Sequence, residues 1–472
     1  MKNPLRTFLP AVATVLFAAA MLPSCSSGRT YLLSPREGDC TQVIQEKLDR
    51  CFHSGGGRVI LKKGEYNVGG LWLRSNTTLL LRSGARLVGS RDCRDYRILS
   101  DEFLASLDPE DVCGDSVVWI PPRLRKEGKA DHITKAGSRW NDAIIRIYKA
   151  ENVAVIGEPL SEIDGCNSYD SEGEEHYRGV HGISAHKSHN LTFKGYTIRN
   201  TGNWAHLMRN CTGAVFEDLE ILAGHDGVHI STCDSVEVVD CVMKTGDDCV
   251  AGFDNRWVTV RGCTLNTACS AFRFGGTHFL AEDCRCYGPG EYPIRGSLTG
   301  EEKESGAMGD TGGRRNMLSL FTYYADRTLP IREAPGDICI RNVTCDDVDR
   351  FLHYNFSGNE TWQLAMPLGG IEFESVKATG IKLPLCAYSS KERPFLLTMR
   401  NCSVSFCGSV PEFIRGAYLE KITIDGLTVE GTPLTPLVRS WGGDDPELDL
   451  NRLDGVTAEV SSPEGPFSVK PI

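Results

Sequence analysis

An apolar pattern repeats about every 22 residues through the middle of the chain. In each copy, apolar side chains fill a first position and the positions two, five and seven residues later. Five consecutive copies start at Leu191, Ala214, Val236, Val258 and Phe279, which are 21 to 23 residues apart. Two pairs of alternating apolar positions indicate two short strands joined by a bend. Further copies start at Ile338, Ile371, Leu397 and Ile422, and a weaker one starts at Val153.

A repeat of this length, with no helical segment between copies, predicts a solenoid in which each coil buries its inner face against its neighbours. The Leu/Asn signature of a leucine-rich horseshoe is missing, and the blades of a propeller need about twice the period. We therefore expect an all-β fold, a right-handed parallel β-helix that occupies residues 26–472. Apolar residues at helical spacing over residues 40–53 predict a helix that caps the N-terminal end of the solenoid.

The repeat converts a spacing along the sequence into a contact in space. Equivalent positions in adjacent coils of a β-helix lie about 4.8 Å apart. Asp226 and Asp248 each stand 12 positions after the start of their coil, and Asp247 stands at position 11. We therefore expect the three carboxylates to converge on one patch of the outer surface. Flanking coils place Asn203, Ser270 and Glu291 at position 12, and His225 and Cys269 at position 11, which extends a polar stripe suited to an elongated polymer.

Three polar segments interrupt the pattern, near residues 91–142, 164–182 and 287–335. Loops of this length are usually functional or disordered. Because loops carry binding residues on rigid scaffolds, we expect these segments to wall a cleft beside the stripe. The last coil is expected to end near Val429, and the chain from Thr432 onward reads as irregular.

Residues 1–25 form a targeting segment. Lys2 and Arg6 precede an apolar run from Phe8 to Leu22, which is short for a membrane-spanning helix. The run ends at Cys25 after small residues, and this ending resembles a bacterial lipoprotein signal in which Cys25 is lipidated. Ordinary secretion with cleavage nearby is the alternative. Both interpretations predict an exported protein, either anchored by lipid in the cell envelope or periplasm of a bacterium, or secreted.

The net charge and the positions of the cysteines limit the binding partners and metal ions that we expect. The formal net charge of −11 argues against a nucleic-acid partner, and we expect membrane attachment only through the lipid anchor. Of the 19 cysteines, Cys241, Cys263, Cys284 and Cys402 occupy the same apolar position of the repeat. Because Cys is a small, readily buried side chain, we expect a stacked ladder in the core. No cysteine spacing suggests zinc, and we expect a monomer with no cofactor and no metal.

Three clustered carboxylates suit hydrolysis of a glycosidic bond. One carboxyl group must stay protonated as the general acid while the others activate water. Crowding of like charges raises at least one carboxyl pKa, which supplies the acid at neutral pH. Two other interpretations stay open at this point. Asp and Gly are common turn residues, so the cluster can be a solvated turn, and several carboxylate oxygens can also hold calcium.

Several stretches, strongest from about residue 40 to residue 265, resemble glycoside hydrolase family 28, the polygalacturonase-like enzymes, and four of them carry most of the resemblance. They are G-G-G-R-V-I-L-K-K-G-E-Y at 55–66, N-T-G-N-W-A-H at 200–206, H-D-G-V-H-I at 225–230 and T-G-D-D-C-V-A at 245–251. The resemblance covers most of the mature chain. It implies that Asp247 is the general acid and that Asp226 and Asp248 position the water for inversion of configuration.

The chain also departs from the family pattern. Ala268-Cys269-Ser270 stands where the family has Gly-His-Gly, and no match to its Arg-Ile-Lys follows. Arg273 is therefore a candidate for contact with an acidic sugar, with Arg295 as a second choice. We add His225, Asn203, Glu291 and Tyr292 as substrate-binding candidates. His229 can assist or be structural, and Trp204 can be a sugar platform or a core residue.

The sequence thus predicts an exported glycoside hydrolase that cleaves a pectic or related polysaccharide. Two alternatives come from other classes: a β-helix that binds polysaccharide without catalysis, and a calcium-dependent polysaccharide lyase. Loss of the family's His and Arg/Lys motifs favours the silent binder, whereas retention of all three Asp residues favours catalysis. A lyase would want a basic residue beside the carboxylates, and Arg273 is the one that the sequence offers.

Overall fold

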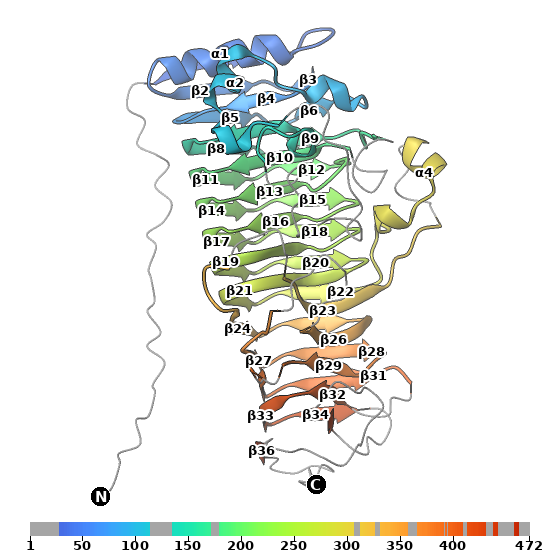
Figure 1. Cartoon of the computed structure of the whole chain (residues 1–472). Coiled ribbons are helices and arrows are strands. Elements are labelled where there is room, and N and C mark those ends of the chain that lie inside the picture. Colours follow the sequence, from blue (N-terminus) through green and yellow to red (C-terminus); the bar gives the residue numbers. More distant parts are fainter. Residues whose placement is uncertain are drawn as a thin grey trace, which may run out of the picture.

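The chain folds into a parallel β-helix whose coils stack along one axis (Figure 1). The computed structural model describes residues 28–113, 135–170, 179–305, 312–325, 331–356, 366–390, 392–393, 395–408, 413–430, 438–441 and 457–461. The predicted signal segment and Cys25 lie outside these ranges. Within them, no helix combines the length and the hydropathy that crossing a bilayer would require. The β-helix predicted from the repeat is confirmed.

Three ladders of parallel strands run along the axis, and each coil contributes one rung to each ladder. The first ladder consists of β4 (Leu71–Leu73), β7 (Ala143–Tyr148), β10 (His181–His186), β13 (His206–Arg209), β16 (Val228–Ser231), β19 (Val250–Arg261), β21 (Ser270–Glu282), β23 (Met317–Tyr323), β26 (Val348–Asn355), β29 (Leu385–Tyr388), β32 (Ile414–Ala417) and β35 (Val438–Trp441).

The second ladder shares the long strands β19 and β21, which continue through a corner of the coil. Its other members are β1 (Arg29–Leu33), β2 (Gly57–Leu61), β5 (Thr77–Leu81), β8 (Glu151–Gly157), β11 (His189–Lys194), β14 (Thr212–Glu217), β17 (Asp234–Val239), β24 (Gly336–Arg341), β27 (Gly370–Glu374), β30 (Phe395–Arg400), β33 (Leu419–Asp425) and β36 (Thr457–Ser461).

The third ladder is a separate sheet of short strands. It contains β3 (Gly64–Val68), β6 (Ala85–Gly89), β9 (Glu162–Asp164), β12 (Thr197–Arg199), β15 (Glu220–Ala223), β18 (Val242–Thr245), β20 (Thr264–Thr267), β22 (Arg285–Tyr287), β25 (Thr344–Asp346), β28 (Lys377–Ile381), β31 (Ser403–Phe406) and β34 (Thr428–Glu430).

The first ladder is absent from the two-strand repeat that the sequence predicts. Its strands do not alternate, because both of their faces are buried: every residue of β13 and of β16 is buried. A period-2 search therefore finds the second and third ladders and passes over this one.

The expected third loop was also too long, because β23 lies within residues 287–335 and adds a rung. Stacking continues past Val429, since β35 pairs with β32 and β36 with β33.

Apolar side chains fill the interior, one stack for each inward position of the coil. Phe193 and Phe216, which are one coil apart, stack with their ring centroids 4.9 Å apart. The predicted cysteine ladder is confirmed as a core feature, because Cys241, Cys263, Cys284 and Cys402 are all buried. Since neighbouring coils supply each other's partners, no coil can bury its inner face alone.

A helix covers the N-terminal end of this core, as the sequence predicts. Helix α1 (Thr41–His53) buries Ile44, Leu48 and Cys51 against the first coils (Figure 1). The other helices are short and lie in the polar excursions. They are η1 (Cys93–Tyr96), α2 (Asp101–Ser106), η2 (Pro109–Asp111), η5 (Arg139–Asn141), η7 (Arg295–Ser297) and α4 (Gly300–Ser305).

Seven successive coils, from β8 to β24, turn into the second ladder at a residue in the left-handed region. Asn152 (φ 56°) and Asn190 (φ 54°) occupy this corner in successive coils, and the amide of Asn190 donates to the side-chain oxygen of Asn152 over 2.5 Å. Asn and Gly adopt this conformation more readily than other residues. The same corner is filled further along by Gly213 (69°), Ser235 (57°), Trp257 (58°), His278 (55°) and Asp337 (50°).

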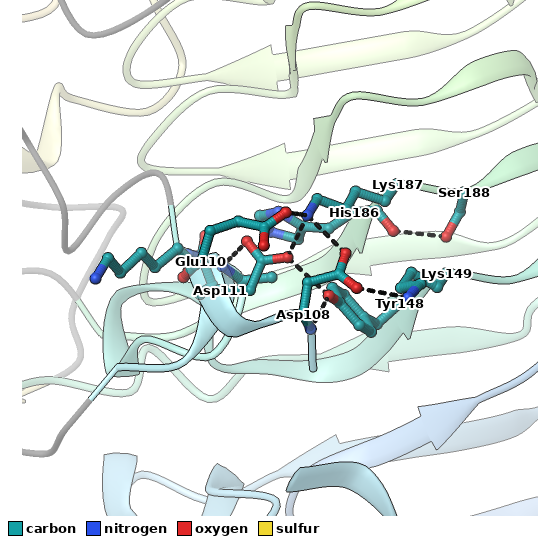
Figure 2. Close-up of polar contacts among 11 residues, drawn as sticks. Asp108, Glu110, Asp111, Tyr148, Lys149, His186, Lys187 and Ser188 are labelled. Carbon is teal, nitrogen blue, oxygen red and sulfur yellow. Dashed lines mark hydrogen bonds and ion pairs between the residues drawn. The ribbon is translucent and has the colours of Figure 1, made fainter. Parts of the chain in front are cut away.

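One lysine fastens the first excursion to the solenoid. Figure 2 shows the ammonium group of Lys187 among three carboxylates of the segment around η2. It lies 2.8 Å from Asp108, 2.9 Å from Glu110 and 2.6 Å from Asp111. The carboxylate of Asp111 also accepts a hydrogen bond from the hydroxyl of Tyr148 over 2.7 Å. The excursion is therefore held against β7 and β10 by charge as well as by packing.

The ammonium groups favour the ionised forms of Asp108 and Glu110. Hydrogen bonds from Lys149 and Lys187 lower the pKa of Asp108 to about 2, and Lys187 lowers the pKa of Glu110. The folded-state pKa of Asp108 thus lies below the unfolded value of about 3.9. Its contribution to stability is present above about pH 4 and is lost as the pH falls toward 2.

We predict that Lys187→Met lowers the free energy of unfolding by about 1–3 kcal/mol, because it leaves three carboxylates crowded without their cation. Urea unfolding at neutral pH measures the loss. Lys149→Met is the matched control, since Lys149 makes a single, half-exposed pair with Asp108 and should cost less than about 1 kcal/mol. Equal losses in the two variants would contradict the central role of Lys187. The difference between wild type and Lys187→Met should shrink below about pH 4.

Candidate active site

Asp226 and Asp248 lie directly opposite each other in adjacent coils. Val228 pairs with Val250 across β16 and β19, and the N–H of Gly227 donates to the carbonyl oxygen of Asp248 over 3.0 Å. Both carboxylates stand two residues before their strand, in the turn that leaves the third ladder. The contact predicted from the repeat is therefore present, and Asp247 belongs to the same turn. Asp226 and Asp248 are buried, with exposed fractions of 2% and 0%, whereas Asp247 is partly exposed.

His229 holds the carboxylate of Asp226. Its Nδ1 lies 2.7 Å from Oδ2 of Asp226, and its ring lies flat on the indole of Trp204, with centroids 3.6 Å apart and planes inclined by 2°. A hydrogen bond on one side and a stacked ring beneath it leave the imidazole one orientation. His229 therefore fixes the carboxylate of Asp226, and it is a site residue that the sequence left undecided between an assisting and a structural role.

Trp204 supports this arrangement from below. The ring is 8% exposed and packs edge-on against Trp140 and at a tilt against His181, with centroids 5.7 and 5.4 Å away. With one face on His229 and these rings around it, Trp204 is a buried support. Of the two interpretations that the sequence left open, the structure thus favours the core residue over the sugar platform.

The register also corrects the expectation for Asn203. His206 pairs with Val228, so Trp204 stands opposite Asp226, and Asn203 is displaced by one residue. The coil beginning at Leu191 has one residue more than the next. Counting positions from the start of the coil ignores this extra residue and therefore selects Asn203 instead of Trp204. Asn203 is fully buried, and its side-chain oxygen accepts the N–H of Trp204 over 3.0 Å. It shapes the turn and does not extend the polar stripe.

Asp248 is held by neighbours from the next coil. Its Oδ1 accepts the N–H of Ser270 over 3.0 Å, and its Oδ2 lies 3.8 Å from a guanidinium nitrogen of Arg273. That guanidinium in turn lies over the ring of Tyr324, 4.3 Å from its centroid. Arg273 thus belongs to the site, as the sequence suggested. Tyr324 was missed, because it follows an excursion of about 30 residues that destroys any spacing signal.

The surroundings of Asp248 favour the protonated form of its carboxyl group. Burial raises the pKa of Asp248 well above its ordinary value, the negative charges of Asp247 and Asp226 raise it further, and Arg273 opposes them. A protonated carboxyl group beside ionised ones is the requirement for acid and base work in one site.

Asp247 projects from a turn that two hydroxyl groups fasten. Thr245 and Thr267 both donate to its carbonyl oxygen, over 2.6 and 2.5 Å. Its Oδ1 accepts the N–H of Asp248 over 3.2 Å. Because the backbone is fixed on both sides while the carboxyl group is partly exposed, Asp247 is the member of the trio best placed to meet a ligand.

Cys269 stands beside Asp247 and Asp248. Its sulfur and the carboxylate oxygens of Asp247 and Asp248 all lie within 4.8 Å of one another. Burial and the two carboxylates raise the pKa of Cys269, so it stays a thiol. Two carboxylates and a thiol do not form the cage of six to eight oxygens that calcium takes. The donor set therefore fits a lyase poorly.

The third excursion packs onto the turns that carry the carboxylates. The N–H of Arg295 donates to the carbonyl oxygen of Gly224 over 3.0 Å, and the guanidinium of Arg314 donates to that of Ala268 over 2.6 Å. Arg295 is fully buried and donates to Asn167 and Ser168 in the second excursion. It ties two excursions together, which corrects its proposed role as an anion contact.

Three further substrate-binding candidates from the sequence are Glu291, Tyr292 and His225. Ser319, and not Glu291, stands opposite Ser270, because residue 291 has left the coil for the excursion. Glu291 is exposed and pairs with Lys244 over 2.9 Å, and Tyr292 beside it is partly buried. His225 precedes Asp226 in the same turn and is buried. The structure therefore brings His225 and Arg273 to the trio and leaves Glu291 outside the polar stripe.

Comparison with known proteins identifies the segment that carries the trio. Residues 123–268 match the family model described as glycosyl hydrolases family 28. The chain is similar in structure to the exopolygalacturonase of Thermotoga maritima, with 15% identity, a TM-score of 0.59, and coverage of 86% of this chain and 93% of that one. A search of the curated proteins finds no match.

Two more solved structures share the fold. The family 28 exopolygalacturonase of Yersinia enterocolitica is 14% identical with a TM-score of 0.54, over 89% of this chain and 77% of that one. The polygalacturonase of Erwinia carotovora ssp. carotovora is 14% identical with a TM-score of 0.51, over 94% of this chain and 100% of that one. At these identities the likeness establishes the fold, and the family match rests on residues 123–268.

We predict that Asp248→Asn abolishes turnover while it raises the free energy of unfolding at pH 7 by about 1–2 kcal/mol. The folded-state pKa of Asp248 is raised, so its stabilising contribution is present below about pH 4 and is lost as the pH rises through the folded value. An amide stays neutral at every pH. Activity assays and urea unfolding at pH 4 and pH 7 check both effects.

Asp247→Asn serves as the comparison. It should also abolish turnover, but with little gain in stability, because Asp247 is partly exposed. A similar gain in both variants would show that burial of Asp248 is not the cause. More than a few per cent of activity left in Asp247→Asn would remove Asp247 as general acid.

Proposed function

We propose that this chain, whose residues 123–268 match the model of glycosyl hydrolases family 28, is a member of that family and hydrolyses a glycosidic bond in a pectic or related polysaccharide. The observation that carries the proposal is the in-register contact of Asp226 with Asp248, beside the partly exposed Asp247. Three carboxyl groups on one patch, one of which has a raised pKa, meet the needs of an inverting hydrolase.

In this mechanism Asp247 gives a proton to the oxygen of the leaving sugar. Asp226 and Asp248 bind the attacking water from the side of the stacked turns and accept its proton. His229 keeps Asp226 in place, since it donates to one oxygen of that carboxylate from a ring fixed on Trp204. The raised pKa of Asp248 means that the trio enters the reaction with a proton, which passes between neighbouring carboxyl groups. No step needs a metal ion.

The site favours this function over its two competitors. A calcium-dependent lyase would need an oxygen cage, and the group around Asp247 supplies two carboxylates and the thiol of Cys269 instead. A silent binding protein has no use for a buried carboxyl group with a raised pKa, which costs stability at neutral pH. Perturbed acids of this kind cluster at catalytic sites.

The substrate is expected to differ from plain polygalacturonate. The family motif Arg-Ile-Lys is missing, and Cys269 replaces the family histidine. Arg273 brings a guanidinium group to the trio, and this group is shared between Asp248 and Tyr324. A single cation at this place suits one acidic sugar in an otherwise different linkage, such as a rhamnogalacturonan fragment or a decorated side chain.

Hydrolysis of oligogalacturonides and rhamnogalacturonan oligosaccharides tests the substrate. We predict a higher kcat/KM on the second class, and a loss of about 10–100-fold in Arg273→Ala, the value of one hydrogen bond to a charged group. Arg273→Lys keeps the charge and should recover part of the loss. Brisk cleavage of plain oligogalacturonides that is unaffected by Arg273→Ala would refute the assignment.

We also propose export with a lipid anchor at Cys25, which rests on the apolar run and small residues that precede it. Mass spectrometry of the protein from a bacterial envelope should find an acylated N-terminal Cys25, and Cys25→Ala should release the protein from the membrane fraction. A free N-terminus at Ser26 or later, with the wild type in the soluble fraction, would contradict the anchor and leave plain secretion.

A further inference from the structure

Trp257 occupies a backbone position that disfavours it. It lies at the corner of its coil with φ 58°, in the column where neighbouring coils place Asn190, Gly213 and Ser235. A large side chain in the left-handed region is an uncommon and unfavourable choice, whereas Asn and Gly adopt the region readily. Strain of this kind persists where the surrounding structure imposes it, and it is concentrated at binding sites.

The side chain of Trp257 is also exposed. Its exposed fraction is 59%, although one face of the indole lies on the ring of His278 in the next coil, with centroids 3.7 Å apart and planes inclined by 12°. The small, exposed Ser235 stands at the same corner on the other side. The second face of the indole is therefore open to solvent, so the side chain gains little burial in return for its strained backbone.

Polar contacts surround the stacked rings of Trp257 and His278, which together form a platform. Nδ1 of His278 lies 2.5 Å from Asp337, and its Nε2 lies 3.8 Å from Glu333. On the other side, Arg256 makes two hydrogen bonds with Asp234, over 3.0 and 2.7 Å. A flat apolar face bordered by fixed charged groups matches a sugar ring, which has an apolar face and a rim of hydroxyl groups.

The platform lies apart from the carboxylates. Trp257 follows Asp248 by nine residues, beyond the part of β19 that belongs to the first ladder and on the far side of a corner. An extended chain of that length spans up to about 30 Å. A polysaccharide molecule that spans this separation can contact both places at once.

We propose that Trp257, stacked on His278, is a second polysaccharide-binding site that holds the polymer by stacking on one of its sugar rings. The chemical class of the ligand rests on the proposed function, and the site itself rests on the strained, exposed and supported indole. Its role is to keep the enzyme on a polymer between cleavage events. Hydrolysis of short fragments does not depend on it.

Binding is measured in the Asp247→Asn background, so that no polymer is consumed. The probes are polygalacturonate and rhamnogalacturonan polymers in affinity gel electrophoresis, with thermal unfolding in parallel. Trp257→Asn should weaken binding of at least one polymer by on the order of 10-fold, as loss of one stacking contact would. Its Tm should stay equal or rise, because Asn suits the left-handed corner. In the active enzyme, kcat/KM on short oligosaccharides should stay unchanged.

Leu160→Asn is the matched control. Leu160 is also apolar, left-handed and exposed, with φ 68° and an exposed fraction of 84%, but no ring stacks on it. It should gain stability in the same way and bind polymer like the parent. Unchanged polymer binding in Trp257→Asn, or a fall in its Tm, would overturn the proposal, as would failure of the parent to bind either polymer. Binding that depends on Trp257 in a protein that hydrolyses no substrate would uphold the platform and count against the proposed hydrolase.

Discussion

The backbone hydrogen bonds between coils are the constraint on which this molecule depends. They fix each residue about 4.8 Å from its counterpart in the next coil, and they do so regardless of what the side chains are. A row of equivalent positions therefore becomes a column of touching side chains. Apolar columns such as Phe193 and Phe216 make the core, and a column of carboxylates makes the site. In a column of carboxylates the like charges repel each other, and neighbouring basic residues reduce this repulsion.

That relief explains much of the local chemistry. His229 lies against Asp226 and Arg273 lies near Asp248, so two of three carboxylates have a basic neighbour while the third stays partly exposed. Burial then works against ionisation of Asp248 and raises the pKa of its carboxyl group. The same logic with the opposite outcome governs Lys187, where one ammonium group pairs with three acids and lowers the pKa of Asp108 and of Glu110. The cluster around Lys187 is structural, because its charges are paired. The trio of carboxyl groups is incompletely neutralised, which suits it to catalysis.

The corners of the coils carry a second column, which the backbone restricts more strongly than the faces. Most coils meet the left-handed requirement with Asn, Gly, Ser or Asp, and the amides of Asn152 and Asn190 bond along the axis. Trp257, on the surface, departs from this preference for small or polar residues. The cysteines of the core ladder fit their column, which requires small, buried side chains. Residues that depart from the demands of their column are thus the ones whose presence calls for a role outside folding.

The sequence alone determined the coil period, the capping helix and the opposition of Asp226 and Asp248, because period and register follow directly from apolar spacing. It could not reveal the first ladder, whose strands are buried on both faces and so do not alternate. It misplaced Asn203 by one residue and put Glu291 on the polar stripe although Glu291 lies in an excursion, because irregular coil lengths and excursions change the register without leaving a mark in the pattern. Only the folded chain brought Tyr324 to Arg273 and Trp204 under His229. Those contacts depend on where side chains point after the coils close, and apolar spacing carries no information about that.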